Sequence, residues 1–260
     1  MYQYKTLVVE CREGTAQVTM NRPEVYNAFN ETQIEELTNC FSQLCDDKSV
    51  YAIVLTGEGR HFCVGADLNW MQKVATYTRE ENIADSKKMG LMFHTINACG
   101  KPVVGRINGS AFGGGVGLVA VCDIAVCNDQ AVFAFSEVNL GIVPAVISSY
   151  VLPKIGASQA RKLFVTGERF TAHKAREIGL VHHVCPLEEL DTTVEKQVHF
   201  LQSSGPRAVR AAKELIQKWS VLQRNEFRDY TEELIADLRA SEEGKEGMKA
   251  FLEKRKSVWR

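Results

Sequence analysis

Four glycines stand within five positions of this chain, beside a strongly apolar run. Residues 111–126 read AFGGGVGLVAVCDIAV, with glycines at 113, 114, 115 and 117. Glycine loses more conformational entropy on folding than any other residue, so the cluster needs a structural reason. No side chain of GGGVGLVAV can ionise. Any chemistry at this run must therefore use the backbone, or side chains that the fold brings to it.

One interpretation is a dinucleotide fingerprint, because Gly115, Gly117 and Ala120 have the GxGxxA spacing and Glu137 follows twenty residues later. The context argues against it. A dinucleotide-binding crossover needs a full helix before its second strand, whereas CDIAV begins five residues after Gly117. The acid at the end of that strand would then be Asp129.

A second interpretation is an oxyanion hole at the start of a helix, where free N–H groups and the positive end of the helix dipole collect. Such a site stabilises an oxygen that becomes negative during a reaction. HFCVGAD, residues 61–67, is the candidate for a second donor, with Gly65 in a turn and Asp67 placed to cap a helix. A purely structural reading, in which both segments are tight turns, remains open.

These segments lie among alternating strand and helix patterns. The hydrophobic spacing predicts strands at 6–10, 16–20, 51–55, 102–107 and 123–127, with helices at 31–45, 80–99 and after the glycine run. Beyond about residue 140 the pattern is mostly helical, at 147–155, 157–165, 171–178 and 187–203, and a charged helical region starts at 206. The sequence predicts one α/β domain with a helical extension.

The composition excludes several classes of protein. The 260 residues carry a formal net charge of -1, which argues against a nucleic-acid binder. No apolar run reaches the roughly 18 residues of a membrane span. MYQYKTLVVE at the start lacks the features of a secretory signal, which favours a cytoplasmic protein.

The eight cysteines include no CxxC motif, and the closest pairs are Cys40/Cys45 and Cys122/Cys127. No cysteine or histidine cluster has zinc spacing, so we expect no metal. We expect reduced thiols, several of which act as small core residues.

Five segments in order now carry a resemblance: FCVGADL, INGSAFGGGVGLVAVCDIAV, FAFSEVNLGIVP, ARKLFVTGERFTAHKAREIGLVHHV and EGMKAFLEKRK. Together they resemble the enoyl-CoA hydratase/isomerase, or crotonase, superfamily. The resemblance implies an α/β spiral of ββα units with two roughly perpendicular sheets and a C-terminal helical trimerisation region. Residues 1–200 would form the spiral core and 201–260 the helical region for oligomerisation and CoA contact, within one structural domain. It further implies a homotrimer or a dimer of trimers.

The same resemblance implies an acyl-CoA substrate, with coenzyme A entering as part of that substrate and no separate cofactor. The backbone N–H groups of Ala66 and Gly114 would hold the thioester oxygen. Phe251 and Lys254 would contact the adenine and phosphate end of CoA in a neighbouring subunit, although Lys254 is also readable as a solvated helix charge. Glu24 stands where many relatives have a lysine. The other implied contacts with CoA or the acyl group are Val25, Val64, Asp67, Leu68 and Ala145.

Hydratases of this family use two glutamates, and the second of them matches Glu137 in FSEVNLG. The plain alternative is that Glu137 is a surface residue near a helix start. The first glutamate falls on Gly117, which cannot ionise. An isomerase needs only one base. Hydration with one carboxylate requires Glu137 both to orient the water and to relay its proton, unless a nearby hydroxyl group takes over part of this role. PAVISSYV offers such hydroxyls at 148–150, where simple packing is the other reading.

Three segments most resemble a bacterial subgroup that is assigned to 3-methylglutaconyl-CoA hydration in leucine and isoprenoid breakdown. They are FCVGADLNWM, GGGVGLVAVCD and LGIVPAVISSYVLPKIG. Three functions therefore stay open: hydration of a short or branched 2-enoyl-CoA, delta3-delta2 enoyl-CoA isomerisation with Glu137 as the single base, and CoA binding without turnover. His182 and His183 are expected at the surface or an interface.

Overall fold

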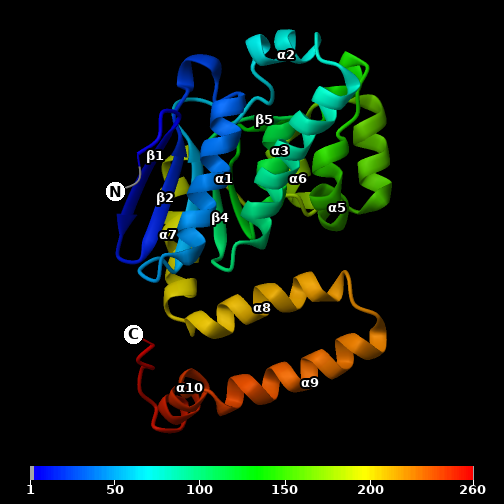
Figure 1. Cartoon of the computed structure of the whole chain (residues 1–260). Coiled ribbons are helices and arrows are strands. Elements are labelled where there is room, and N and C mark those ends of the chain that lie inside the picture. Colours follow the sequence, from blue (N-terminus) through cyan, green and yellow to red (C-terminus); the bar gives the residue numbers. More distant parts are fainter. Residues whose placement is uncertain (1–2, 260) are drawn as a thin grey trace.

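The computed structural model describes residues 3–259, which form two sheets surrounded by helices (Figure 1). The larger sheet has six strands in the spatial order β1 (Leu7–Arg12), β2 (Thr15–Met20), β3 (Ala52–Gly57), β4 (Val103–Ile107), β6 (Ile124–Asn128) and β9 (His183–Cys185). The smaller sheet has three, in the order β5 (Ala111–Phe112), β7 (Val132–Ala134) and β8 (Phe170–Thr171).

The larger sheet begins as a hairpin and continues as a parallel sheet. β1 and β2 pair antiparallel around a turn in which Glu13 and Gly14 both have positive φ angles, of 48° and 75°. From β2 onward each neighbour is parallel, so the chain must cross back over the sheet between strands. These crossovers run through α1 (Glu31–Asp46), α3 (Arg79–Ala98) and α4 (Gly114–Val121). The repeated strand–helix crossover gives the spiral.

The remaining helices complete the layers around the sheets. Those of the core are α2 (Leu68–Val74), α5 (Ala145–Thr166), α6 (Ala172–Glu177) and α7 (Leu190–Gln202), with short 3-10 turns η1 (Pro23–Val25), η2 (Ser136–Leu140) and η3 (Leu187–Glu189). The main hydrophobic core lies between the sheets and α1, α3, α4 and α5. A smaller apolar cluster on the other face of the larger sheet is covered by α7.

Local sequence signals explain where the site-bearing helices begin and end. The Asn30 side chain accepts the Gln33 N–H at 2.9 Å and caps α1. Thr78 and Glu81 form a reciprocal capping box at the start of α3. Gly156, with a φ of 71°, interrupts α5, which agrees with the two helices expected at 147–155 and 157–165.

The chain is mostly helical after residue 140, as predicted, but the sequence analysis did not identify two short strands there. β8 and β9 fall in that region, and β9 completes the larger sheet beside β6. The predicted 187–203 helix is a 3-10 turn followed by α7. Strands of two or three residues are too short to show alternating hydrophobicity, so pairing with a preformed sheet decides their conformation.

The last three helices form a separate layer, here called the C-terminal layer: α8 (Pro206–Trp219), α9 (Arg224–Ala240) and α10 (Glu242–Leu252). They lie at the end of the molecule opposite α2 (Figure 1). α8 contacts the core through Lys213, whose Nζ lies 2.8 Å from Asp123 Oδ2. Whether this layer oligomerises, as predicted for 201–260, stays a prediction.

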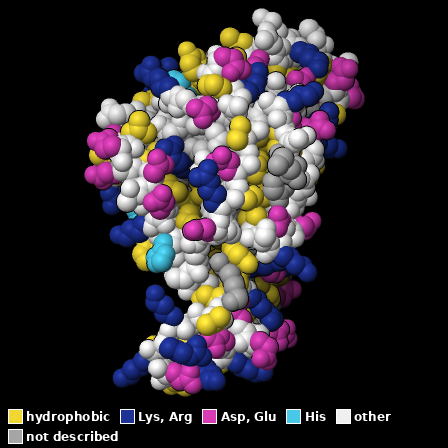
Figure 2. Space-filling view, turned by 90° about the vertical axis from the view of Figure 1, so that its left-hand side faces the viewer, with side chains coloured by type: hydrophobic (Ala, Val, Ile, Leu, Met, Phe, Trp, Pro, Cys, Tyr) yellow, Lys and Arg dark blue, Asp and Glu magenta, His cyan; other side chains and the backbone are white. Residues whose placement is uncertain are grey.

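The surface carries mixed charge. On the side shown in Figure 2, acidic and basic side chains alternate over the core and the C-terminal layer, with no large field of one sign. Within residues 3–259, no helix combines the length and apolar character that crossing a membrane requires. Six of the eight cysteines are buried, so the expectation that several act as core residues is confirmed.

Candidate active site

Two loops, residues 63–67 and 111–115, lie side by side although more than forty positions separate them. Cys63 and Ala111 form an isolated parallel bridge, and the Phe112 N–H donates to the Cys63 carbonyl at 3.0 Å. The Phe29 N–H donates to the Gly65 carbonyl at 2.6 Å and holds the first loop from its other side. The second loop begins with β5 (Figure 1) and leads into α4.

The glycines allow this close approach. A Cβ on Gly115 would overlap the Cys63 carbonyl, so the two loops could not lie at their observed spacing with any other residue there. Gly65 and Gly113 have φ angles of +96° and +50°, which side chains other than glycine rarely adopt. The glycines at 113 and 115 are thus required by backbone contact and conformation.

The two loops also present unpaired backbone donors. Among residues 3–259, neither the Ala66 N–H nor the Gly114 N–H donates to a backbone or side-chain acceptor. Ala66 is exposed and Gly114 half-buried, so both can be reached from outside. Gly114 opens α4, where the helix dipole adds positive potential. The pair can therefore bind an oxygen that carries developing negative charge.

Glu137 faces these donors from η2. Its Oε1 lies 3.2 Å from the position that a Cβ on Gly113 would take, which places the carboxyl group against the glycine run. Its Oε2 is buried and has no partner within the described residues. Burial raises the pKa of Glu137, a shift opposed by a backbone hydrogen bond. A carboxyl group with a raised pKa and a free oxygen is suited to moving a proton.

Gly117, in contrast, faces a tightly packed apolar wall made by Phe29, Phe93, Ile147 and Tyr150. A Cβ at 117 would overlap Cγ2 of Ile147 and lie 2.9 Å from two ring carbons of Phe93. The Phe93 ring in turn contacts Phe29 edge-on and Tyr150 at a tilt, with centroids 6.3 and 6.0 Å apart. A glutamate could not occupy position 117 unless this apolar wall moved.

The three candidate hydroxyls of α5 differ in their surroundings. The Ser148 hydroxyl donates to the Ala145 carbonyl at 2.6 Å, and Ser149 is exposed. Tyr150 is half-buried in the apolar wall, and burial raises the pKa of its phenol. Tyr150 is therefore the hydroxyl of the three that the fold places beside Phe93.

Asp67 supports the loop with its side chain. One carboxylate oxygen caps α2 by accepting the Asn69 N–H at 2.8 Å, and the other lies 2.7 Å from Arg22 Nη2. Burial alone raises the pKa of Asp67, but the bonds from Arg22 and the α2 backbone outweigh it and hold the pKa below its usual value. The Asp67 N–H also donates to the Phe29 carbonyl at 2.8 Å and its carbonyl accepts the Met71 N–H at 2.8 Å, so the fold uses Asp67 to hold the loop in place. The sequence analysis did not identify Arg22; its place in NRPE, before a proline turn, gave no sign of a partner 45 positions away.

The fold brings most of the predicted CoA contacts to the loops. The Val64 N–H donates to the Tyr26 carbonyl at 3.2 Å, which places Val25 and η1 beside loop 63–67. Leu68 follows that loop and is 75% exposed. Ala145 is exposed at the start of α5. Phe251 and Lys254 are not gathered here, because α10 and the residues after it lie at the opposite end of the molecule (Figure 1).

No group of three or more histidine, cysteine, aspartate or glutamate side chains in the described part of the chain is arranged to hold a metal.

Comparison with known proteins agrees with this geometry. A solved enoyl-CoA hydratase from Shewanella pealeana superposes with a TM-score of 0.94 and is 36% identical, covering 99% of this chain and 97% of that chain. A crotonyl-CoA hydratase from Syntrophomonas wolfei is 33% identical over 98% of this chain and 97% of its own length. A probable mitochondrial enoyl-CoA hydratase from Dictyostelium discoideum is also 33% identical, over 99% and 91%.

The two sheets, the helical spiral and the C-terminal helices are those of the α/β crotonase fold, as the resemblance implied. The family model for enoyl-CoA hydratase/isomerase matches residues 10–260. The chain belongs to the enoyl-CoA hydratase/isomerase family.

Proposed function

We propose that this protein hydrates a short 2-enoyl-CoA, with Ala66 and Gly114 as oxyanion donors and Glu137 as acid and base. One observation carries the proposal: a half-buried carboxyl group with an unpartnered oxygen lies against the start of a helix with free N–H groups. The three relatives compared above are named as hydratases. One is named for crotonyl-CoA, and the names of the other two give no acyl chain length.

The proposed steps need one carboxylate. Glu137 removes a proton from water while the hydroxyl oxygen forms a bond to the β carbon of the substrate. The electron pair of the double bond moves onto the thioester oxygen, where the Ala66 and Gly114 N–H groups stabilise the enolate. Glu137 then returns the proton to the α carbon, and the enolate collapses to the 3-hydroxyacyl thioester. Loss of one such N–H donor costs about 3 kcal/mol of barrier in measured oxyanion holes.

Gly117 favours a second candidate, the delta3-delta2 enoyl-CoA isomerase. In that reaction Glu137 removes a proton from the α carbon of a 3-enoyl-CoA and returns it to the γ carbon. The oxyanion hole is the same, but no water is needed. Since a Cβ at 117 overlaps Ile147, the first glutamate of the family's hydratases has no place in this packing.

The proposal for the acyl group is a short or branched chain. The apolar wall, with Phe93 and Ile147 packed against Gly117, leaves little room in that direction. The resemblance of three segments to 3-methylglutaconyl-CoA hydratases supports a branched substrate of that kind and a place in leucine breakdown.

We further propose that the protein works as a homotrimer or a dimer of trimers in the cytoplasm. The C-terminal layer exposes large apolar side chains, including Ile216, Trp219 and Phe251, of which Phe251 is 83% exposed. Exposed apolar patches of this kind favour protein contacts. A neighbouring subunit would bring Phe251 and Lys254 to the CoA of this site, which they do not reach within one chain. Light scattering tests the assembly, since a monomer at working concentration would contradict it.

The test of the reaction uses three substrates, crotonyl-CoA, 3-methylglutaconyl-CoA and a 3-enoyl-CoA. Each is assayed with the wild type, with Glu137→Gln and with Glu188→Gln, an exposed control. We expect hydration by the wild type and the control, and a kcat about 10³-fold lower in Glu137→Gln. The deuterium content of the product formed in D₂O reports proton transfer directly.

Each other outcome selects a different function. Double-bond migration without hydration supports the isomerase. Retained CoA binding without turnover supports a binding protein. Hydration at an unchanged rate in Glu137→Gln contradicts the role given to Glu137.

A further inference from the structure

Two cysteines meet at the ends of the two helices that pack together over the core. Cys45 lies in the last turn of α1 and Cys99 is the C-cap residue of α3. Their side chains are in hydrogen-bonding contact. The N–H of Gly100, the residue after Cys99, also donates to Cys45 Sγ at 3.4 Å. We call Cys45 and Cys99 the thiol pair.

The surroundings of the thiol pair make the two sulfurs unequal. Cys45 is half-buried, whereas Cys99 is 2% exposed. Burial is the main cause that raises the pKa of Cys99, to about 12. Cys45 is therefore the thiol that an oxidant reaches first, and the Gly100 N–H holds its sulfur beside Cys99.

Positive charge lies close to the same place. Arg210 of α8 packs over Gly100, with Nε 2.8 Å from the position of a Cβ there. Lys213 acts on Cys99 electrostatically and favours its ionised form. Lys213 thus opposes part of the effect of burial on Cys99, although the pKa of Cys99 stays raised and Lys213 is also paired with Asp123.

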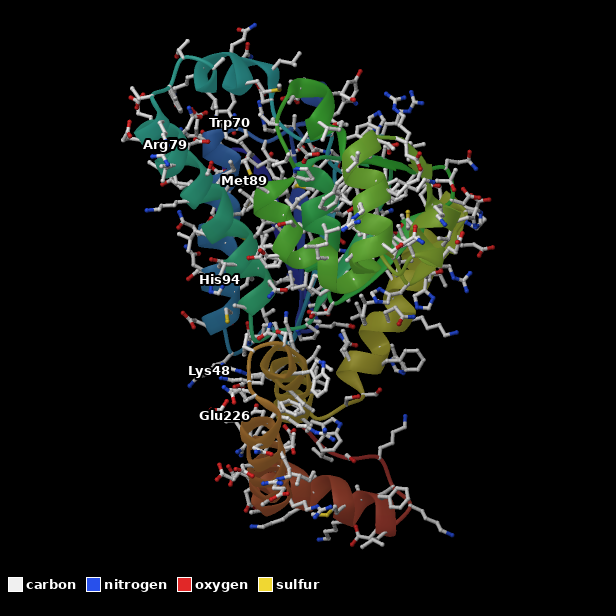
Figure 3. All side chains as sticks on the ribbon, turned by 90° about the vertical axis from the view of Figure 1, so that its right-hand side faces the viewer. Lys48, Trp70, Arg79, Met89, His94 and Glu226 are labelled. Carbon is white, nitrogen blue, oxygen red and sulfur yellow. The ribbon has the colours of Figure 1, made fainter. Side chains whose placement is uncertain are left out.

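The thiol pair also lies where the C-terminal layer docks. Gln217 Nε2 donates to the Asn97 carbonyl at 2.7 Å, and Lys213 Nζ donates to the Lys101 carbonyl at 3.1 Å, on either side of Cys99. Figure 3 shows α3 running from Arg79 past Met89 and His94 toward the C-terminal layer, with Lys48, just beyond α1, at the same end of the core.

We propose that the thiol pair is a site of reversible oxidation, which closes to a disulfide on exposure to a hydroperoxide. The Cys45 thiolate attacks the peroxide oxygen, which breaks the O–O bond and leaves a sulfenic acid and an alcohol or water. The Cys99 sulfur then displaces hydroxide from that sulfenic acid, and the hydroxide leaves as water with the Cys99 proton. Overall two thiols lose two electrons and two protons, and the peroxide is reduced. A dithiol reverses the reaction by exchange.

The bond would tie the end of α1 to the end of α3 under α8. It would close a loop from residue 45 to residue 99, which restricts the unfolded chain. The oxidised protein should therefore resist unfolding more than the reduced one, and the gain should be lost on reduction. Oxidation of this kind in a reducing compartment is a feature of sensing cysteines.

The experiment uses the full chain, first reduced and then treated with hydrogen peroxide in slight excess. Remaining thiols are blocked with an alkylating agent, and the digest is mapped by mass spectrometry without reduction. We expect a cross-linked peptide joining Cys45 to Cys99. We also expect the melting temperature to rise by about 5–10 °C and to return when dithiothreitol is added.

Two variants provide the matched controls. Cys45→Ser should lose both the cross-link and the shift in melting temperature. Cys11→Ser, which removes the exposed cysteine, should keep both. Circular dichroism of the reduced proteins shows whether each variant is folded before oxidation.

Three results would overturn the proposal. The first is a wild-type chain that keeps both thiols free in peroxide. The second is a cross-link between Cys11 and Cys40 in place of the thiol pair, since those two cysteines also interact. The third is oxidation of Cys45 to sulfinic acid with Cys99 still free.

Discussion

The two loops and the apolar wall meet at the glycine run, but the loops act through backbone groups and the apolar wall acts through side chains. Loops 63–67 and 111–115 offer backbone N–H groups; Gly115 is required because the Cys63 carbonyl leaves no room for a Cβ, and Gly65 and Gly113 because of their positive φ angles. The apolar wall acts through the side chains of Phe93 and Ile147, which fill the space beside Gly117. One segment of sequence thus contains glycines that are needed for two unrelated reasons.

This difference separates the general part of the site from the specific part. In the proposed mechanism, backbone donors would bind a thioester oxygen whatever acyl chain is attached, so the loops would set the class of reaction. The side chains of the apolar wall would then set the shape beside the reacting carbons and so which acyl chain fits. Gly117 belongs to the apolar wall, although in sequence it reads as the last glycine of the loop.

The largest effect is expected when the support of loop 63–67 is removed. Asp67→Ala removes the carboxylate that pairs with the mostly buried Arg22 guanidinium. It also removes the side-chain cap of α2. Breaking one side of a buried pair costs about 3–5 kcal/mol. We expect a loss near the lower end of that range in urea unfolding, with weaker oxyanion stabilisation and a reduced kcat.

Asp237→Ala, which removes an exposed acid from α9, is the matched control and should change the free energy of unfolding by less than about 0.5 kcal/mol. If Asp67→Ala cost no more than this control, the loop would hold its conformation through its backbone contacts alone, and the side chains of Asp67 and Arg22 would have no supporting role.

The same comparison explains what the sequence could predict. The glycine run, the turn at Gly65 and the capping role of Asp67 were predictable because glycine and capping residues report local backbone geometry. The alternation of strands and helices up to β6 followed for the same reason, since each element carries its own periodicity.

The apolar wall could not be predicted in this way. Phe93 and Ile147 come from two helices 54 positions apart, and nothing local to either shows that both face Gly117. Arg22 was missed because its partner, Asp67, is also far away in sequence. The strands β8 and β9 were missed because tertiary pairing, rather than local pattern, makes them strands. The roles given to the individual site residues remain predictions.

A smaller effect is expected at the apolar wall. Gly117→Ala adds a Cβ that overlaps Ile147 Cγ2, and overpacking of this kind costs about 1–3 kcal/mol. Ile147→Ala opens a cavity and should cost about 2–4 kcal/mol alone. In the double variant the new methyl group enters that cavity, so we expect the combined loss to be smaller than the sum by about 1 kcal/mol.

Urea unfolding of the four proteins measures this coupling. Strict additivity would mean that Gly117 and Ile147 do not share space in solution, and the steric reason for glycine at 117 would be wrong. Retention of the oxyanion contacts in the same variants, tested by binding of acetyl-CoA, would show that the loops and the apolar wall are separable.

The smallest effect concerns Glu137, whose carboxyl group lies against Gly113 and whose charged form is disfavoured by burial in the folded protein. Its pKa is raised in the folded protein, so at pH values between the ordinary value and the raised one the unfolded chain releases this proton first. Stability from this group is therefore complete below the ordinary glutamate pKa and falls as the pH rises through the folded value. Glu137→Gln stays neutral at every pH and should escape this fall.

We therefore expect Glu137→Gln to match the wild type in free energy of unfolding near pH 4 and to exceed it at pH 7, while its kcat is lower at both. The gain is at most about 1.4 kcal/mol for each unit by which the pKa is raised, and smaller because solvent screens a half-buried group. Glu188→Gln, on the exposed surface, should show no such pH dependence. A variant less stable than the wild type at pH 7 would mean that the carboxylate is stabilised by its surroundings, and Glu137 would then be a structural anion held by the loops rather than a proton carrier.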